Sequence, residues 1–482
     1  MHLRDTHLVG AGAACAAVWL ITGDWLGGVA LFVLLASYML VATGDKLYVL
    51  PMAITFHWMQ TSLGVFYNGF TGRALDAIEL SDYRPMVLVG LGCVFALAVG
   101  VAIGLRLIKG RPANRERPAF AFSTPLLVMM YVGTILTEET LLSQTAQFPS
   151  LRQIIVTFDA ARLGCLFLLL RRLCAPPAQW TWFGAIVLLE VTMGITGYFA
   201  GFRDPLVLAI LATLEVFDRS KTRHWLAVAA VAAVGALFAV VWMGIRSEYR
   251  GEFAGIDAIG GATRGRVERV TTLSSDFLKR DPTSFLNTAD NLVTRLWAIY
   301  YPALALQRVP DPVPHTDGTI LLAALQHVAT PRVFFPGKAD LPSDSEMVRK
   351  YANVMVAGRE ENTSIAFGYA AEAYIDFGIP LMFLPIFAWG VVIGVLYQFF
   401  RTRIGHRDLF VAFATLTFWL SLYLFERSWA TELGVSVGLF VYLGVPTILL
   451  DRFLMVRVER ERQTDFAAPT MGSSYPRAER GR

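Results

Sequence analysis

Charged residues are scarce in this chain, and their scarcity argues against an ordinary soluble protein. Asp, Glu, Lys and Arg make up only 17% of the 482 residues, whereas 55% of the residues are hydrophobic. Apolar runs recur along the sequence from Leu8 to Leu450. This composition is typical of a helical protein that crosses a membrane many times. The net charge of +4 is too small to indicate a nucleic-acid partner, so we expect none.

Cysteine is equally scarce, and several familiar catalytic motifs are missing. The four cysteines lie in or beside apolar runs, at Cys15, Cys93, Cys165 and Cys174. None falls between residues 246 and 377, so this polar segment is neither a disulfide-stapled module nor a cysteine metal site. The sequence also has no Walker A loop, no His-Glu-x-x-His motif and no Asp-x-Asp motif. ATP-driven chemistry and metal-assisted hydrolysis are therefore unsupported, and we expect no cofactor and no metal.

Twelve apolar runs predict an all-α polytopic membrane protein, since a membrane-spanning helix takes about 20 apolar residues. The predicted spans are 7–23, 25–43, 48–67, 86–108, 124–142, 153–170, 181–200, 205–218, 225–245, 378–400, 409–425 and 433–451. Counted from a cytoplasmic N-terminus, every short basic connection falls on the cytoplasmic side, as the positive-inside rule requires. We therefore expect both termini in the cytoplasm and residues 246–377 outside.

The same topology divides the chain into four parts. They are 1–245, a bundle of nine spans; 246–377, a large outside loop; 378–451, three further spans; and 452–482, a disordered tail. The loop is too long and too charged to be a passive connector, so we expect it to handle a polar substrate. Its predicted parts are irregular chain over Arg246–Thr272, helices over Phe285–Gln307 and Thr319–Val328, a proline-rich turn over Thr330–Pro342, and Tyr369–Asp376 leading into the next span.

Arginines at the outer ends of the spans are the first candidates for binding a polyanion. Arg203 lies in the short outside turn Gly201–Pro205, where it either binds a ligand, snorkels from a helix end or pairs with Asp204. Arg246 and Arg250 follow the ninth span at i and i+4, so a continuing helix would present both on one face. A solvated, charged helix end is the alternative for this second pair.

A basic loop supplies further cations. Prolines at both ends of Pro331–Pro336 restrict the backbone and hold Arg332 and Lys338 among aromatic residues. Stiff cations suit a polyanionic group, because they lose little entropy on binding it. The alternative interpretation is a basic surface turn.

The sequence offers fewer candidates for a proton acceptor than for a cation that binds a polyanion. Glu372 lies where the outside segment re-enters the membrane, and partial burial there would raise its pKa toward the range of a general base. A structural partner for an arginine is its alternative role. His315 and His327 are the outside histidines; both fit a surface or packing role, and His327 is also a possible proton acceptor. Glu190 and Glu215 should face the bundle interior, since a charge at a helix centre costs ~2.5–3.5 kcal/mol on insertion.

Four stretches together resemble bacterial oligosaccharide repeat-unit polymerases of the Wzy type. They are Gly201–Pro205, Arg246 directly after a span, Pro331–Lys338 and Glu372–Gly378, in this order around one long outside loop. One departure is the Asp204 that follows Arg203, where the family pattern favours a smaller residue. The resemblance implies a GT-C-like polymerase/ligase architecture, with about twelve transmembrane helices and a long, partly helical periplasmic loop, in the bacterial inner membrane.

The resemblance also implies a reaction. Such enzymes join undecaprenyl-diphosphate-linked oligosaccharide repeat units by glycosyl transfer on the periplasmic face of the membrane. The partners would be the lipid-linked donor and acceptor and membrane lipids, with a chain-length regulator and a flippase beside them. We hypothesise that Arg203, Arg246 and Arg332 hold the diphosphate and that Glu372 acts as general base. The further substrate-binding candidates are Lys338, Arg295, Arg427, Tyr374 and His327.

Three other functions stay open at this point. A ligase that moves a finished polysaccharide from the same lipid shares the outside loop and the arginine chemistry. A lipid-linked sugar flippase or transporter predicts charges along a central pathway, repeated halves and short loops, whereas this chain concentrates its polarity in one outside block. A non-catalytic membrane scaffold for polysaccharide assembly is the third alternative.

Overall fold

The described part of the chain is built from helices. The computed structural model describes residues 2–43, 47–72, 83–108, 122–148, 151–195, 203–218, 220–253, 284–358, 360 and 364–454. Over these residues no strand occurs, which confirms the predicted all-α class. The predicted tail lies outside the described residues from position 455 onward.

Every one of the twelve predicted spans overlaps a helix. In chain order these helices are α1 (His2–Thr22), α2 (Trp25–Val41), α3 (Val49–Thr71), α4 (Arg84–Leu107), α5 (Thr124–Gln147), α6 (Arg152–Cys174), α7 (Trp180–Ile195), α8 (Arg203–Glu215), α9 (Thr222–Phe253), α16 (Phe383–Arg403), α17 (Arg407–Leu422) and α18 (Trp429–Gly438). A π-helical turn, η3 (Leu439–Leu443), follows α18, and the helix then continues to Leu454.

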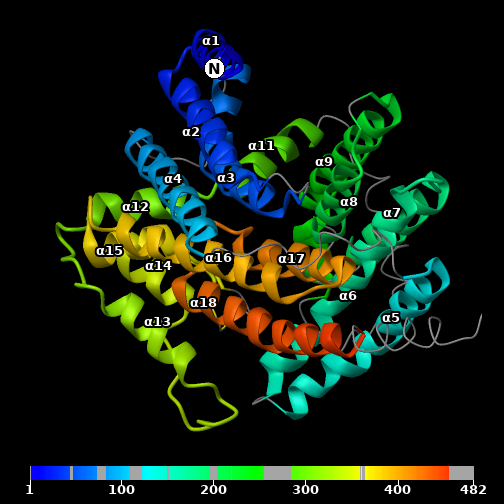
Figure 1. Cartoon of the computed structure of the whole chain (residues 1–482). Helices are drawn as coiled ribbons and strands as arrows, with labels where there is room; N and C mark the ends of the chain where they lie inside the picture. The colour runs from blue at the N-terminus through cyan, green and yellow to red at the C-terminus, as the bar shows by residue number, and fades with distance from the viewer. Residues whose placement is uncertain are drawn as a thin grey trace, which may run out of the picture.

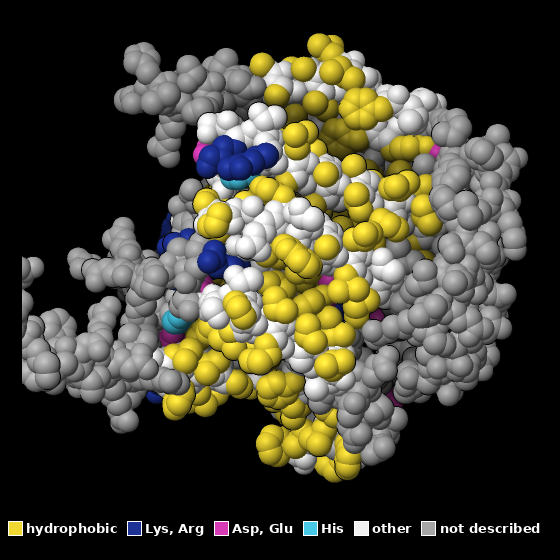
Figure 2. Space-filling model, turned by 90° about the vertical axis from the view of Figure 1, so that its right-hand side faces the viewer, with side chains coloured by type: hydrophobic (Ala, Val, Ile, Leu, Met, Phe, Trp, Pro, Cys, Tyr) yellow, Lys and Arg dark blue, Asp and Glu magenta, His cyan; other side chains and the backbone are white. Residues whose placement is uncertain are grey.

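Five helices in the described ranges are long and apolar enough to cross a membrane. They are Arg84–Leu107, Gln153–Cys174, Thr222–Met243, Phe383–Arg403 and Trp429–Leu454. Figure 2 shows hydrophobic side chains spread over one face of the molecule, with Lys and Arg gathered toward one edge of that face. An apolar belt with basic residues at its edge is compatible with a membrane protein. The count of twelve crossings stays a prediction.

Two small-residue motifs bring α4 and α16 into backbone contact near the middle of the molecule (Figure 1). Gly100 and Gly104 on α4 face Gly390 and Gly394 on α16. A Cβ atom on Gly100 would lie 2.2 Å from the Phe387 carbonyl oxygen, so no larger residue fits there without moving the helices apart. Small residues four apart let membrane helices pack closely, because in lipid van der Waals contact is a main driving force.

Glu190 and Glu215 each belong to a buried group of charged residues, as predicted for the bundle interior. Glu190 is 1% exposed; its Oε1 lies 2.5 Å from Arg162 Nη1 and accepts a hydrogen bond from the Tyr131 hydroxyl. Glu215 is 6% exposed, and its Oε2 lies 2.6 Å from Nε of Arg171. Arg171 Nη1 in turn donates to Asp408 Oδ1 at 2.5 Å, which joins α6, α8 and α17 through one buried arginine.

The predicted outside loop contains five described helices, gathered at the left of Figure 1 except for α11. They are α11 (Ser284–Leu296), α12 (Tyr300–Arg308), α13 (Thr319–Ala329), α14 (Asp344–Ala352) and α15 (Tyr369–Phe377). α13 confirms the helix predicted over Thr319–Val328, and residues 330–342 form turns as predicted. The irregular chain predicted from Arg246 is wrong as far as Phe253, because α9 continues to that residue; the rest of it to position 272 lies outside the described residues.

The single helix predicted over Phe285–Gln307 is also wrong, because the chain breaks at residues 297–299. Trp297 Nε1 donates to the Thr61 carbonyl oxygen at 2.8 Å, and the Ala298 N–H donates to the Gln60 carbonyl oxygen at 2.9 Å. These two bonds connect the loop to α3. A continuous helix would bond the Ala298 N–H within itself, so contact with α3 favours the break.

Candidate functional site

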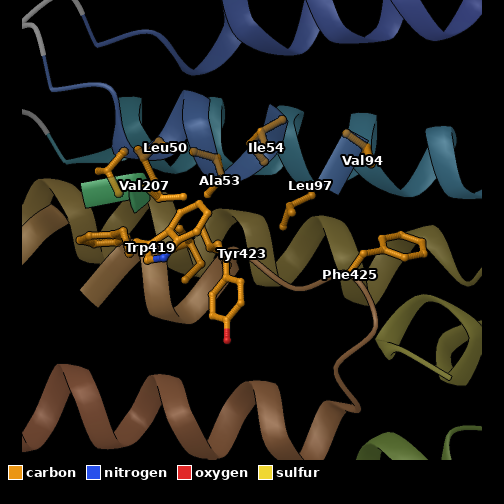
Figure 3. Packing of buried hydrophobic residues seen from close by; sticks show 14 of the residues in the cluster. Leu50, Ala53, Ile54, Val94, Leu97, Val207, Trp419, Tyr423 and Phe425 are labelled. Carbon is orange, nitrogen blue, oxygen red and sulfur yellow. The ribbon is translucent and has the colours of Figure 1, made fainter. Parts of the chain in front are cut away.

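Two guanidinium groups lie over the ring of Tyr423, the residue that directly follows α17. Arg203 Cζ is 4.1 Å from the ring centroid and Arg427 Cζ is 4.6 Å from it. Tyr423 stacks on Trp419 at 5.2 Å, and Figure 3 shows its hydroxyl pointing away from the α3 side chains Leu50, Ala53 and Ile54. The attraction between a cation and an aromatic face therefore holds both arginines beside one rigid ring.

Arg203 is the first residue of α8 rather than part of a turn before it. Its Nε lies 3.3 Å from Asp204 Oδ1, and the same oxygen accepts a hydrogen bond from Trp419 Nε1 at 3.1 Å. Of the alternatives for Arg203, the structure thus shows the pairing with Asp204. Within the described ranges no hydrogen bond uses the two terminal nitrogens of Arg203, whose side chain is 39% exposed. Those nitrogens can bind an anion without breaking the contact that holds Arg203 in place.

Arg295, on α11, lies close enough to Arg203 for the two charges to interact. Its Nη1 donates to Glu426 Oε2 at 2.8 Å and its Nη2 to Glu426 Oε1 at 3.3 Å, which is a forked carboxylate contact. The negative charge of Glu426 raises the pKa of Arg295, and the nearby positive charge of Arg203 works weakly against that shift. We call Arg203, Arg295 and Arg427, together with Tyr423 and Glu426, the arginine cluster.

Arg427 is the most buried of the three arginines, with 11% of its side chain exposed. Its Nη1 lies 3.6 Å from Glu432 Oε2 and also donates to the Leu420 carbonyl oxygen. Trp389 Nε1 donates to the other oxygen of Glu432 at 3.4 Å. These contacts fix Arg427 to α17, α18 and α16, so its charge keeps one position.

A second basic group lies on the loop after α13. Arg332 pairs with Asp340, and Lys338 Nζ donates to the His327 carbonyl oxygen at 2.7 Å. Burial lowers the pKa of His327, and the charges of Lys338 and Arg332 lower it further, which favours a neutral imidazole. In the described part of the chain, no hydrogen bond or ion pair joins this group to the arginine cluster.

These contacts divide the predicted cations into two groups that differ from the predicted one. The hypothesis that Arg203 and Arg332 hold one diphosphate gains no support, whereas Arg295 and Arg427, expected only as helpers, lie beside Arg203. α9 includes the positions of Arg246 and Arg250, as the continuing helix required, but their side chains lie outside the described residues. Sequence reasoning missed Tyr423 and Glu426. Glu426 lies in a predicted outside connection next to Arg427, which was its signal, whereas Tyr423 falls near the end of the predicted span 409–425 and had none.

Glu372 and Tyr374, two further candidates on α15, are engaged with the protein itself. Glu372 is 4% exposed, and its Oε2 accepts the Trp429 N–H, at the start of α18, at 2.7 Å. Burial raises the pKa of Glu372 to about 8, in the direction predicted from its position. Tyr374 donates its hydroxyl to the Val309 carbonyl oxygen at 2.7 Å. Glu372 has a helix N-terminus as its partner instead of the arginine that was suggested.

Protonated Glu372 should therefore stabilise the fold in a pH-dependent way. A glutamate side chain has an ordinary pKa of 4.5, whereas that of Glu372 in the folded protein is about 8, so its contribution is full below about pH 4.5 and is lost as the pH rises through 8. We expect Glu372→Gln, which mimics the neutral acid and keeps an acceptor for Trp429, to unfold at a temperature that falls less than wild type between pH 6 and 9. Thermal unfolding of the purified protein across this range checks the expectation; parallel curves for the two proteins would contradict it.

The sequence matches the family described as Domain of unknown function (DUF8712) over residues 96–413, two thirds of the chain. The matched range includes Arg203, Arg295 and the basic group of Arg332, and it ends before Tyr423 and Arg427. No match was found among curated proteins or among solved structures. The family description names no activity.

Proposed function

The chain belongs to the family described as Domain of unknown function (DUF8712), and we propose that it is a membrane glycosyltransferase that polymerises lipid-linked oligosaccharides. It moves a growing chain from undecaprenyl diphosphate to the next lipid-linked repeat unit, on the periplasmic face of the bacterial inner membrane. The observation that carries the proposal is the arginine cluster, where two guanidinium groups lie over the ring of Tyr423 and a third pairs with Glu426. The five apolar helices support the membrane setting.

The chemistry of this reaction suits arginine. Negative charge develops on the lipid diphosphate as its glycosidic bond breaks, and arginine stays protonated while its forked donors match phosphate oxygens. A hydrogen bond to a charged group contributes roughly 1.5–3 kcal/mol. Because Asp204 and Tyr423 already fix Arg203, little reorganisation is needed when the charge develops. The donor itself stores the bond energy, so the reaction requires no nucleotide.

The two carboxylate oxygens of Glu426 accept hydrogen bonds from the Arg295 guanidinium, as two oxygens of a diphosphate would. A bound diphosphate must displace it, which makes Glu426 a competitor of the substrate. We expect Glu426→Gln to lower the KM for the lipid-linked donor several-fold, since a neutral amide competes less well for a guanidinium. Initial rates at varied donor concentration measure this effect. Glu360→Gln is the matched control, because Glu360 pairs with Arg349 away from the cluster and its loss should leave KM unchanged.

A reconstitution tests the proposed activity. Purified protein in lipid nanodiscs is incubated with a defined undecaprenyl-diphosphate repeat unit, without nucleotide or added metal. We expect a ladder of lengthening lipid-linked oligosaccharides and free undecaprenyl diphosphate. Transfer to an added non-lipid acceptor without elongation would indicate the ligase instead, and an unchanged repeat unit would argue against both enzymes.

A further inference from the structure

The helix α13 exposes apolar side chains beside its buried face. Ala324 and Val328 turn toward the protein, whereas Leu322 and Leu325 point outward and are 55% and 48% exposed. Exposed apolar side chains that adjoin a buried face mark a surface that contacts another protein or a membrane. α13 has 11 residues, so it is about 16 Å long and too short to cross a hydrocarbon layer of about 30 Å.

The turn that follows α13 extends the same apolar surface. Phe334 is 76% exposed and Phe335 is 52% exposed, with Val333 exposed beside them. Arg332 and Lys338 flank these side chains. Aromatic residues next to cations with long apolar stems are typical of segments that lie at the surface of a bilayer.

Both ends of α13 are fixed to neighbouring helices. At its start, Asp376 of α15 accepts hydrogen bonds from the Thr316 hydroxyl and from the N–H groups of Ile320 and Leu321, at 2.5, 3.0 and 2.9 Å. α15 leads directly toward α16. Near its other end, Val328 packs against Gly434 of α18, and Figure 1 shows α13 beside α18 with its turn extending beyond both. α13 therefore lies against α18, one of the helices that are apolar enough to cross a membrane, and is bonded to α15, which precedes another of them.

We propose that α13 and the turn up to Lys338 dock on the surface of a phospholipid bilayer. Phe334 and Phe335 insert at the level of the acyl chains, while Arg332 and Lys338, with their contacts to Asp340 and His327, lie at the level of the lipid phosphate groups. Charge favours lipid over a second copy of this chain, because Arg332, Lys338 and Asp340 leave a net positive surface that would repel its own copy. The proposal does not depend on the enzymatic activity proposed above.

A fluorescent depth measurement tests the docking. Phe334→Cys and Met355→Cys each receive an environment-sensitive label, in a protein whose Cys15 and Cys165 are replaced by serine. Met355 is the matched control, since it is 86% exposed and lies in the same segment but outside the proposed surface. Both proteins are placed, one copy per nanodisc, in lipid with or without a nitroxide on the upper acyl chain.

We expect the label at 334 to shift to shorter wavelength and to lose most of its fluorescence in nitroxide lipid, while the label at 355 responds only to iodide in the buffer. The same size-exclusion profile for both variants and wild type shows that they are folded. If folded protein labelled at 334 responds to iodide and not to nitroxide lipid, the docking proposal is wrong. A wavelength shift that appears only when two copies share one nanodisc would likewise overturn it, in favour of a dimer contact.

Discussion

Arg203→Ala should lower the initial rate of polymer formation about 10- to 100-fold, because it removes hydrogen bonds to a charged leaving group worth roughly 1.5–3 kcal/mol. The two terminal nitrogens of Arg203 are the donors that the described contacts leave for a ligand. Removing them leaves Arg295 and Arg427 in place, so the activity should fall without vanishing. The measurement is the release of undecaprenyl diphosphate from a defined repeat unit in nanodiscs.

Two variants separate this role from a structural one. Arg203→Lys keeps the charge but loses the fork that matches phosphate, so its rate should lie between wild type and Arg203→Ala. Arg403→Ala removes an arginine that also lies near an aromatic ring, Phe399, at the end of α16, and should keep the wild-type rate. A folded Arg203→Ala protein with the wild-type rate would remove Arg203 from the mechanism.

Arg171→Met should lower the free energy of unfolding by about 3–5 kcal/mol, the usual cost of deleting one partner of a buried ion pair. Arg171 is 2% exposed and lies between the carboxylates of Glu215 and Asp408. Without the arginine, these two negative charges remain buried with much weaker compensation, although Arg407 still lies 3.2 Å from Glu215. Thermal unfolding of the detergent-purified protein measures the loss.

A triple variant of the same buried group should restore the stability that Arg171→Met loses. Replacing all three charges, by Arg171→Met, Glu215→Gln and Asp408→Asn together, removes the uncompensated carboxylates and should recover much of the lost stability. Arg403→Ala is again the control, since its side chain is not part of a buried ion pair among the described residues and its loss should change stability little. A single Arg171→Met protein as stable as Arg403→Ala would contradict this account of the buried group.

The positions of the helices follow from the sequence because apolar runs are a local signal. Other features depend on partners far along the chain. The break at Trp297 requires the carbonyl groups of α3, and no pattern within residues 285–307 reveals it. Two missed features did have sequence signals: α14 opens with Ser343 and Glu346 at capping-box spacing, and α4 carries glycines four apart.

For the site, too, the sequence predicts which types of residue are suitable but not which of them lie together. The sequence indicates that cations near the outer ends of the spans suit a diphosphate, and Arg203 is predicted on that ground, whereas Arg295 and Arg427 are predicted only as further substrate-binding residues. It does not indicate which cations meet, because α8, α11 and the end of α17 are separated by more than a hundred residues in places. The proline-stiffened loop identified Arg332 and Lys338 as cations, yet their described partners are Asp340 and His327.

The central claim is that the arginine cluster, and not the basic loop after α13, binds an isoprenoid diphosphate. The most direct test is a titration of nanodisc-embedded protein with undecaprenyl diphosphate, comparing wild type with Arg295→Ala and Arg332→Ala. We predict that Arg295→Ala weakens binding about tenfold or more, as expected for losing a forked contact to a charged group, and that Arg332→Ala leaves the Kd unchanged. Weaker binding in Arg332→Ala together with wild-type binding in Arg295→Ala would contradict the claim.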